Sequence, residues 1–114
     1  MHEVSIALNL LDIVTAQCRK EGYSRIDAVR IKIGRASGIM PDALAFAFDA
    51  IKGDSIAAAA LLEIEEIPLT GSCRDCGAVF TTEAEYVLAC PACAGLSFFM
   101  TAGRELDIID MEVS

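Results

Sequence analysis

Histidine is nearly absent from this chain, because among its 114 residues only His2 carries an imidazole. Histidine is the side chain most often used as a general base, and an open catalytic metal site usually takes more than one imidazole ligand. The sequence also contains no glycine-rich phosphate-binding loop. These absences argue against an enzyme. They favour a metal-binding or protein-binding role.

Basic residues are scarce as well. Nine Lys and Arg stand against 17 Asp and Glu, which gives a net charge of −8 at pH 7. The phosphates of nucleic acid would be repelled by such a surface, so no nucleic-acid partner is expected. No apolar run reaches the length of about 18 residues that a membrane-spanning helix needs. The N-terminus lacks the features of a secretory signal, and we expect a cytoplasmic protein with no membrane partner.

Two segments have the apolar spacing of amphipathic helices. The first covers residues 4–21, and Gly22 is placed to end it with a left-handed backbone. The second begins at Pro41, whose missing N–H costs nothing in a first helical turn, and ends at Gly53. The side chains expected on the buried stripes are Val4, Ala7, Leu8, Leu11, Val14 and Cys18 in the first helix and Leu44, Ala47, Phe48 and Ile51 in the second.

Three segments alternate between apolar and polar residues, as half-buried strands do. They are residues 27–33, the stretch LLEIEEIPL that starts at residue 61, and residues 106–113. The alternation is disturbed near Glu66–Ile67, which predicts a bulge or the end of the strand. The side chains expected to face inward are Val29, Ile31 and Ile33 in the first strand, Leu62 and Ile64 in the second, and Ile109, Met111 and Val113 in the third.

Residues 70–103 interrupt this pattern with four cysteines and no helical stripe. The cysteines form two C-x2-C pairs, Cys73 with Cys76 and Cys90 with Cys93, separated by thirteen residues. Two residues between cysteines let a tight turn aim both thiolates at one ion, and Gly77 supports the left-handed backbone of the first turn. Thirteen residues suffice for a short hairpin that sets the pairs opposite each other. Four thiolates make a closed tetrahedral site, which predicts a structural zinc.

Two other interpretations of the four cysteines stay open. A rubredoxin-like iron site uses similar turns and would make the chain an electron carrier, although such cytosolic sites more often hold zinc. Disulfides fit a reducing compartment poorly. The spacing indicates a metal but no function, because zinc ribbons occur in many unrelated proteins. We interpret the fifth cysteine, Cys18, as a small core residue of the first helix.

The first three residues offer a second set of metal ligands. The amine of Met1, the backbone nitrogen of His2 and its imidazole can chelate one ion, since the α-amine has a pKa of only about 8. Three nitrogens in a plane suit Ni(II) or Cu(II), and Glu3 could complete the set through its backbone nitrogen or carboxylate. Taken alone, a terminal histidine is more often simply solvated. Glu3 can equally serve as an acid at the positive end of the first helix.

The MHE start occurs together with longer motifs, namely IKIGRASG, PDALAFAFDAIKGDSIAAAALLEIEEIP, the two cysteine pairs and GRELDIIDMEV. In combination, over essentially the whole chain, they closely resemble the HypA/HybF family of nickel metallochaperones for NiFe-hydrogenase maturation. The resemblance implies an α+β fold in which two helices pack on a small three-stranded sheet, with an inserted zinc-ribbon domain. It implies a nickel-binding domain of residues 1–69 with 104–114 and a zinc-binding domain of residues 70–103.

The resemblance also implies the sites. Met1, His2 and Glu3 would bind Ni(II), which the chain transfers without being an enzyme. The structural zinc ligands would be Cys73, Cys76, Cys90 and Cys93. Many relatives carry an acid near the position of Met40, whereas the nearest acid here is Asp42. A carboxylate ligand from this loop is therefore not carried over.

The expected partners are those of the family, a HypB-type GTPase and the precursor of the hydrogenase large subunit. The junction near Ile67–Gly71 could permit two chains to exchange elements, which leaves a homodimer open. The alternative function is that of a zinc-ribbon protein-interaction scaffold without nickel transfer. Nickel binding that depends on the free N-terminus separates the two hypotheses.

Overall fold

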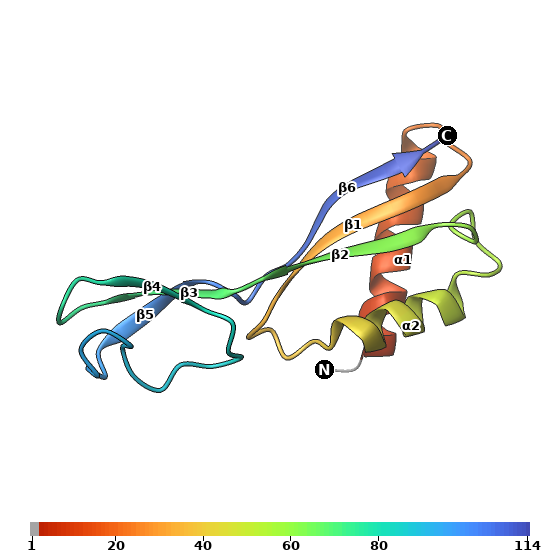
Figure 1. The fold of residues 1–114 in the computed structure, drawn as a ribbon. Helices are drawn as coiled ribbons and strands as arrows, with labels where there is room; N and C mark the ends of the chain where they lie inside the picture. Colours follow the sequence, from red (N-terminus) through yellow and green to blue (C-terminus); the bar gives the residue numbers. More distant parts are fainter. Residues whose placement is uncertain (1–2) are drawn as a thin grey trace.

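The computed structural model describes residues 3–114, and within them the chain forms two helices and six strands. Their order is α1 (Glu3–Lys20), β1 (Ile26–Gly34), α2 (Pro41–Ile51), β2 (Leu61–Ile67), β3 (Leu69–Cys73), β4 (Val79–Thr82), β5 (Phe98–Ala102) and β6 (Leu106–Val113). The strands form two three-stranded sheets, of order β2-β1-β6 and β4-β3-β5. The molecule is elongated, 53 × 24 × 16 Å, with the sheets end to end (Figure 1). The predicted α+β fold is confirmed.

We call the two helices and their sheet the helical lobe, and the second sheet with its loops the cysteine lobe. In the helical lobe, the central strand β1 pairs parallel with β2 and antiparallel with β6. Val29, Ile31 and Ile33 of β1 are buried as predicted, and Phe48 of α2 is fully buried against them. Within residues 3–114, neither helix is long and apolar enough to cross a membrane.

The predicted buried stripe of α1 is partly wrong. Val4 and Leu8 are 54% and 47% exposed, whereas Ile6 and Leu10 are buried. The residues of the predicted stripe that are buried are Ala7, Val14 and Cys18. The N-terminal half of α1 carries apolar residues on several sides, so their spacing alone does not decide which side faces inward. That choice is made by contact with α2 and with the sheet.

The prediction for β6 fails at one residue. The register of β6 against β1 shifts between Arg30 and Ile31, whose partners are Asp110 and Ile108. Ile109 is the extra residue of this β-bulge and is 43% exposed, so it does not face inward as predicted. The position of this bulge cannot be predicted from the apolar and polar alternation of β6 alone, because it is defined by the pairing of β6 with β1.

At the bulge, the alternation of inward and outward side chains along β6 shifts by one residue. Leu106 and Ile108 lie on its N-terminal side. Ile108 lies beside Ile31 and Leu106 beside Ile33 in the register, and both β1 residues are buried. On the C-terminal side of the bulge, the predicted inward residues Met111 and Val113 pack against the core. The inward face of β6 therefore reads Leu106, Ile108, Met111 and Val113.

The ends of three elements test the predicted stop signals. Gly22 adopts a left-handed backbone with φ of 84° just beyond α1, as predicted. The helix α2 begins at Pro41 but ends at Ile51, with Lys52 as the capping residue, so Gly53 lies outside it. The strand β2 pairs with β1 without a register shift and ends at Ile67. The sequence predicted either a bulge or the end of the strand near Ile67, and the structure has the end of the strand.

The lobes meet where the loop after β1 packs against both connections between the sheets. Gly34 donates its N–H to the carbonyl of Glu105 at 2.8 Å, and Ala36 donates to the carbonyl of Gly103 at 2.7 Å. A Cβ on Gly34 would lie 2.1 Å from the carbonyl carbon of Gly103. Gly34 of the motif IGRASG must therefore be glycine to approach the backbone of Gly103, in the motif GREL. The predicted domain boundaries, at residues 69–70 and 103–104, stay a prediction.

Candidate metal centre

The four cysteines are presented by two turns of similar construction. In the first, Gly77 donates its N–H to the carbonyl of Cys73 at 3.1 Å. In the second, Ala94 donates to the carbonyl of Cys90 at 2.8 Å. Gly77 and Ala94 both have a left-handed backbone, with φ of 73° and 61°. Each turn therefore bends the chain around its sulfurs, and the first does so with the glycine that the sequence predicts.

The cysteine lobe departs from the predicted hairpin between the two cysteine pairs. The residues between Cys76 and Cys90 contain one strand, β4, followed by a loop. Instead of folding back on itself, β4 pairs antiparallel with β3. The first cysteine turn is thus the turn of a hairpin, and β5 pairs with the other side of β3. The second cysteine turn lies in the loop that enters β5.

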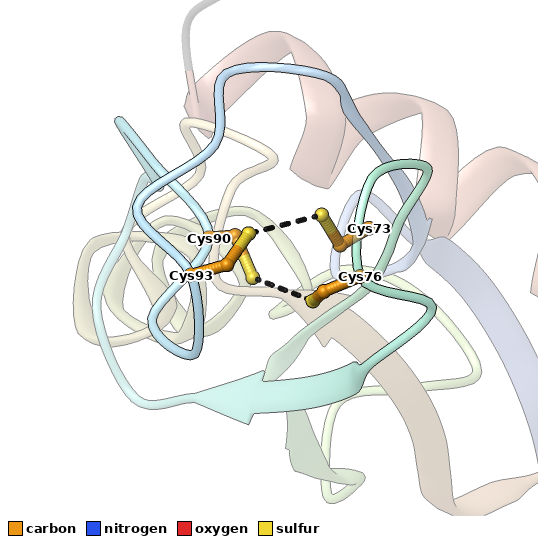
Figure 2. Close-up of side chains that lie close together, drawn as sticks. All are labelled: Cys73, Cys76, Cys90 and Cys93. Carbon is orange, nitrogen blue, oxygen red and sulfur yellow. Dashed lines mark hydrogen bonds between the residues drawn. The ribbon is translucent and has the colours of Figure 1, made fainter.

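The four sulfurs lie at the spacing of a tetrahedral metal site. All four Sγ atoms are within 4.8 Å of one another. The Sγ atoms of Cys73 and Cys93 are 3.6 Å apart, and those of Cys76 and Cys90 are 3.7 Å apart (Figure 2). Four sulfurs at about 2.3 Å from a zinc ion would be about 3.8 Å from one another. A disulfide would need about 2.05 Å, so the geometry fits one ion, and none of the four cysteines forms a disulfide.

The electrostatics of the cluster favour a bound cation. The backbone N–H of Cys93 and, more weakly, that of Ala92 stabilise the Cys90 thiolate and lower its pKa to about 7 against the opposing effect of desolvation. The N–H of Gly95 lowers the pKa of Cys93, but the neighbouring sulfurs of Cys73 and Cys76 raise it to about 12 overall. Four sulfurs this close cannot all ionise next to one another. A divalent cation removes that conflict, because it attracts every thiolate.

The four sulfurs form a closed metal site. Cys73 and Cys90 are buried, while Cys76 and Cys93 are exposed at the outside of their turns. Below them, the rings of Phe80 and Phe98 make an edge-to-face contact with centroids 6.0 Å apart. Four sulfur ligands fill a tetrahedron and leave no position for water or substrate. The chemistry of the donor set fits zinc in a structural role.

Of the three predicted nickel ligands, only Glu3 lies within the residues that the structure describes. Met1 and His2 lie outside the described residues, so the structure does not place them. Glu3 is the first residue of α1 and belongs to the helical lobe. Figure 1 shows that the start of α1 lies beside α2, whereas β3 carries Cys73 to the far end of the second sheet.

The loop after β1 carries contacts that the sequence analysis did not predict. The Nη2 of Arg35 lies 3.0 Å from Oε2 of Glu83, which joins the helical lobe to the cysteine lobe. Asp42, in the first turn of α2, lines a hollow of about 170 Å³ together with Glu66 and Glu85. Only tertiary contact brings these residues together, since they come from four separate segments of the chain.

These observations first define a class. Two helices on a three-stranded sheet, extended by a lobe with a closed four-cysteine cluster, describe a small zinc-ribbon-type metal-binding protein. The family model described as "Hydrogenase/urease nickel incorporation, metallochaperone, hypA" matches residues 1–113. The chain belongs to this HypA family, as the sequence motifs predicted.

Curated relatives agree with the family model. A hydrogenase maturation factor HypA of Pelodictyon phaeoclathratiforme is 42% identical over 113 residues, which cover 99% of this chain and 96% of the relative. The protein of the same name from Rhizobium leguminosarum bv. viciae is 41% identical, with 99% of each chain covered.

Solved structures show the same fold. The solution structure of the nickel metallochaperone HypA from Helicobacter pylori has a TM-score of 0.69 and 25% identity, and covers 99% of this chain and 97% of that one. A further solution structure of a HypA protein has a TM-score of 0.72 at 25% identity. The likeness extends over both lobes, because the matches cover 99% and 100% of this chain.

Proposed function

We propose that this chain is a non-enzymatic nickel carrier that binds Ni(II) at its N-terminus and delivers it for the maturation of NiFe hydrogenase. The observation that carries the proposal is the match of the family model for nickel incorporation to residues 1–113. A HypB-type GTPase and the precursor of the hydrogenase large subunit would be its partners. The alternative, a zinc-ribbon scaffold without nickel transfer, would share the fold but have no use for a free terminal amine.

The nickel ligands in this proposal are the amine of Met1, the backbone nitrogen and imidazole of His2, and a group of Glu3. The position of Glu3 supports its part. As the first residue of α1, it belongs to the turn whose backbone N–H groups have no partner within the helix. Its backbone nitrogen can therefore be given to a metal without breaking the helix, and its carboxylate is the other available ligand.

The same position explains why the ion would be released again. The N-terminal end of a helix carries a partial positive charge, which repels a cation bound there. Ionised backbone nitrogens offset that repulsion while nickel is held. Their reprotonation by a partner environment would tip the balance toward release. A site of this kind suits an ion that is handed on, whereas the four-cysteine cluster suits an ion that stays.

The proposal assigns a second, resident ion to the cysteine lobe. Cys73, Cys76, Cys90 and Cys93 would hold one zinc, which closes the lobe and takes no part in the nickel chemistry. Metal analysis of the purified chain should find one tightly held zinc. A rubredoxin-like iron would instead colour the protein, since a ferric four-thiolate centre absorbs visible light and a zinc centre does not.

Calorimetric titration of the untagged, zinc-loaded protein with Ni(II) tests the nickel site. His2→Ala and a variant extended by two residues before Met1 should both abolish or sharply weaken binding, because each removes a nitrogen ligand. Asp42→Asn is the matched control, since it also alters an exposed polar group of the helical lobe and should leave the affinity unchanged. Unchanged affinity in the first two variants would favour the scaffold.

A further inference from the structure

The outer edge of β6 is open. In the sheet order β2-β1-β6, β6 pairs on one side with β1, and within residues 3–114 no strand pairs with its other side. An unpaired edge presents a row of backbone N–H and C=O groups that can pair with another extended chain. At eight residues, from Leu106 to Val113, β6 is long enough to hold such a segment. The edge is thus a template for a fourth strand.

Beside this edge, an apolar groove lies between α1 and β6. The groove has a volume of about 370 Å³, and its walls include Ile6, Leu10 and Ile13 of α1 and Leu106 and Ile108 of β6. The polar residues Asn9 and Asp107 also line it. Ile13 is 56% exposed, and Ile108 is 37% exposed. Inward-facing apolar residues of an added strand would enter this groove and cover those side chains, which is favourable by burial of apolar surface.

The opposite face of the same strand is acidic. Asp110 and Glu112 lie on the outer face of the sheet, where Arg30 forms ion pairs with both, and Asp107 lies opposite Lys32 in the register of β6 against β1. Asp107 forms no ion pair with any residue between 3 and 114. A cation on a neighbouring strand would be attracted to this row, and an anion would be repelled.

We propose that the edge of β6 binds an extended segment of a partner protein in which apolar and basic residues alternate. Backbone pairing with β6 would supply register, apolar residues would fill the groove beside α1, and basic residues would face Asp107 and its neighbours. This mode of recognition adds a strand to an existing sheet. It uses neither metal site and is independent of the proposed nickel function.

A second copy of this chain is a poor occupant of the same edge. Antiparallel pairing of two β6 strands would place the acids of one strand opposite the acids of the other, which is destabilising. Each chain also carries a net charge of −8, so long-range repulsion opposes the pair. Charge complementarity therefore selects a basic segment over self-association.

The test uses the zinc-loaded full chain and a capped peptide of alternating Val and Lys, with the same number of residues as β6. Amide NMR spectra should show binding of one peptide per chain, with slowed hydrogen exchange for the β6 amides that point away from β1. A peptide of alternating Val and Glu is the charge control and should not protect these amides. Protection that is absent with the Val–Lys peptide, or equal with both peptides, overturns the proposal.

Two matched pairs of variants locate the contact. Asp107→Lys should weaken binding of the Val–Lys peptide by about 5-fold, whereas Asp54→Lys, with the same charge change in an exposed loop, should have a much smaller effect. Ile13→Ser in the groove should weaken binding more than Leu96→Ser, which alters an exposed apolar residue of the cysteine lobe. Equal affinities within each pair, or a dimer by sedimentation that Asp107→Lys disrupts, would exclude a basic segment as the occupant.

Discussion

The two lobes of this molecule contain sheets of the same number of strands but differ in what stabilises them. In the helical lobe, fourteen buried residues from both helices, β1 and the segment between α2 and β2 form one apolar core. In the cysteine lobe, the buried cluster is Cys73, Phe80 and Cys90, so two of its three members belong to the four-cysteine cluster. Large apolar side chains of the cysteine lobe, among them Val79, Leu88 and Leu96, are more than 70% exposed.

The difference teaches that the fold uses two sources of stability for two purposes. Burial of apolar side chains is sufficient for the lobe that carries the N-terminus. The cysteine lobe has a small apolar core, and the proposed zinc would supply the free energy of folding that its apolar contacts do not. Disruption of one source should therefore leave the other lobe folded. The following variants test that separation, beginning with the largest expected effect.

Cys90→Ala should release the zinc and unfold the cysteine lobe. Structural zinc contributes on the order of 10 kcal/mol to the folding of small zinc-dependent domains, and three remaining thiolates cannot close the site. Zinc content and amide NMR signals of residues 70–103 are the measurements. Cys18→Ala is the control, because Cys18 is buried in α1 and lies in the other lobe. One tight zinc per chain retained by Cys90→Ala would contradict the separation.

Phe48→Ala should destabilise the helical lobe by about 3–5 kcal/mol, because it leaves a cavity beneath α2 where the ring is fully buried. Denaturant unfolding followed by circular dichroism measures the loss, and zinc content should stay at one per chain. Phe46→Ala, on the same helix, removes a ring that is 78% exposed and should change the free energy of unfolding by less than about 1 kcal/mol. Equal losses in the two variants would show that α2 is not packed through Phe48.

Gly34→Ala should cost about 1–3 kcal/mol, since the added methyl collides with the backbone of Gly103 at the junction of the lobes. The shift should appear in NMR signals of both lobes, because the loop after β1 contacts both connections. Gly53→Ala is the control, because a Cβ there meets no atom within 4 Å, and it should be neutral or slightly stabilising. A neutral Gly34→Ala would mean that the close approach does not hold the lobes together.

Glu83→Gln should have the smallest effect, at most about 0.5 kcal/mol, because its ion pair with Arg35 is exposed and screened by solvent. A change in the relative orientation of the lobes is the more sensitive measure, and residual dipolar couplings would detect it. Glu85→Gln provides the comparison, since Glu85 is also exposed and forms no ion pair with residues 3–114. A large loss of stability from Glu83→Gln would show that the ion pair with Arg35, and not backbone packing, holds the lobes together.

Local patterns were sufficient for much of the fold. The start of α2 at Pro41, the left-handed stop at Gly22 and the buried alternation of β1 were predicted because each depends on a residue's own backbone or on its nearest neighbours. The four-cysteine cluster was also predicted from local sequence. Their spacing already predicted a single cluster, which the sulfur positions confirm.

The errors have a different physical origin. The buried side of α1 depends on where α2 and the sheet lie, and apolar residues around much of the helix fit more than one choice. The bulge at Ile109 depends on the register against β1, which involves residues about 80 positions away. The contact of Gly34 with Gly103 likewise joins distant segments. A pattern within one segment carries no information about such pairings.

By itself, the sequence of this chain determined its two helices, the three strands of the helical lobe, the clustering of four cysteines and its family, because these follow from side-chain identity and short-range spacing. The tertiary structure decided the inward face of β6, the glycine contact between the lobes and the open groove beside α1. Each of those features is a relation between distant segments. Its free energy depends on how surfaces fit together in space, and that fit exists only once the chain has folded.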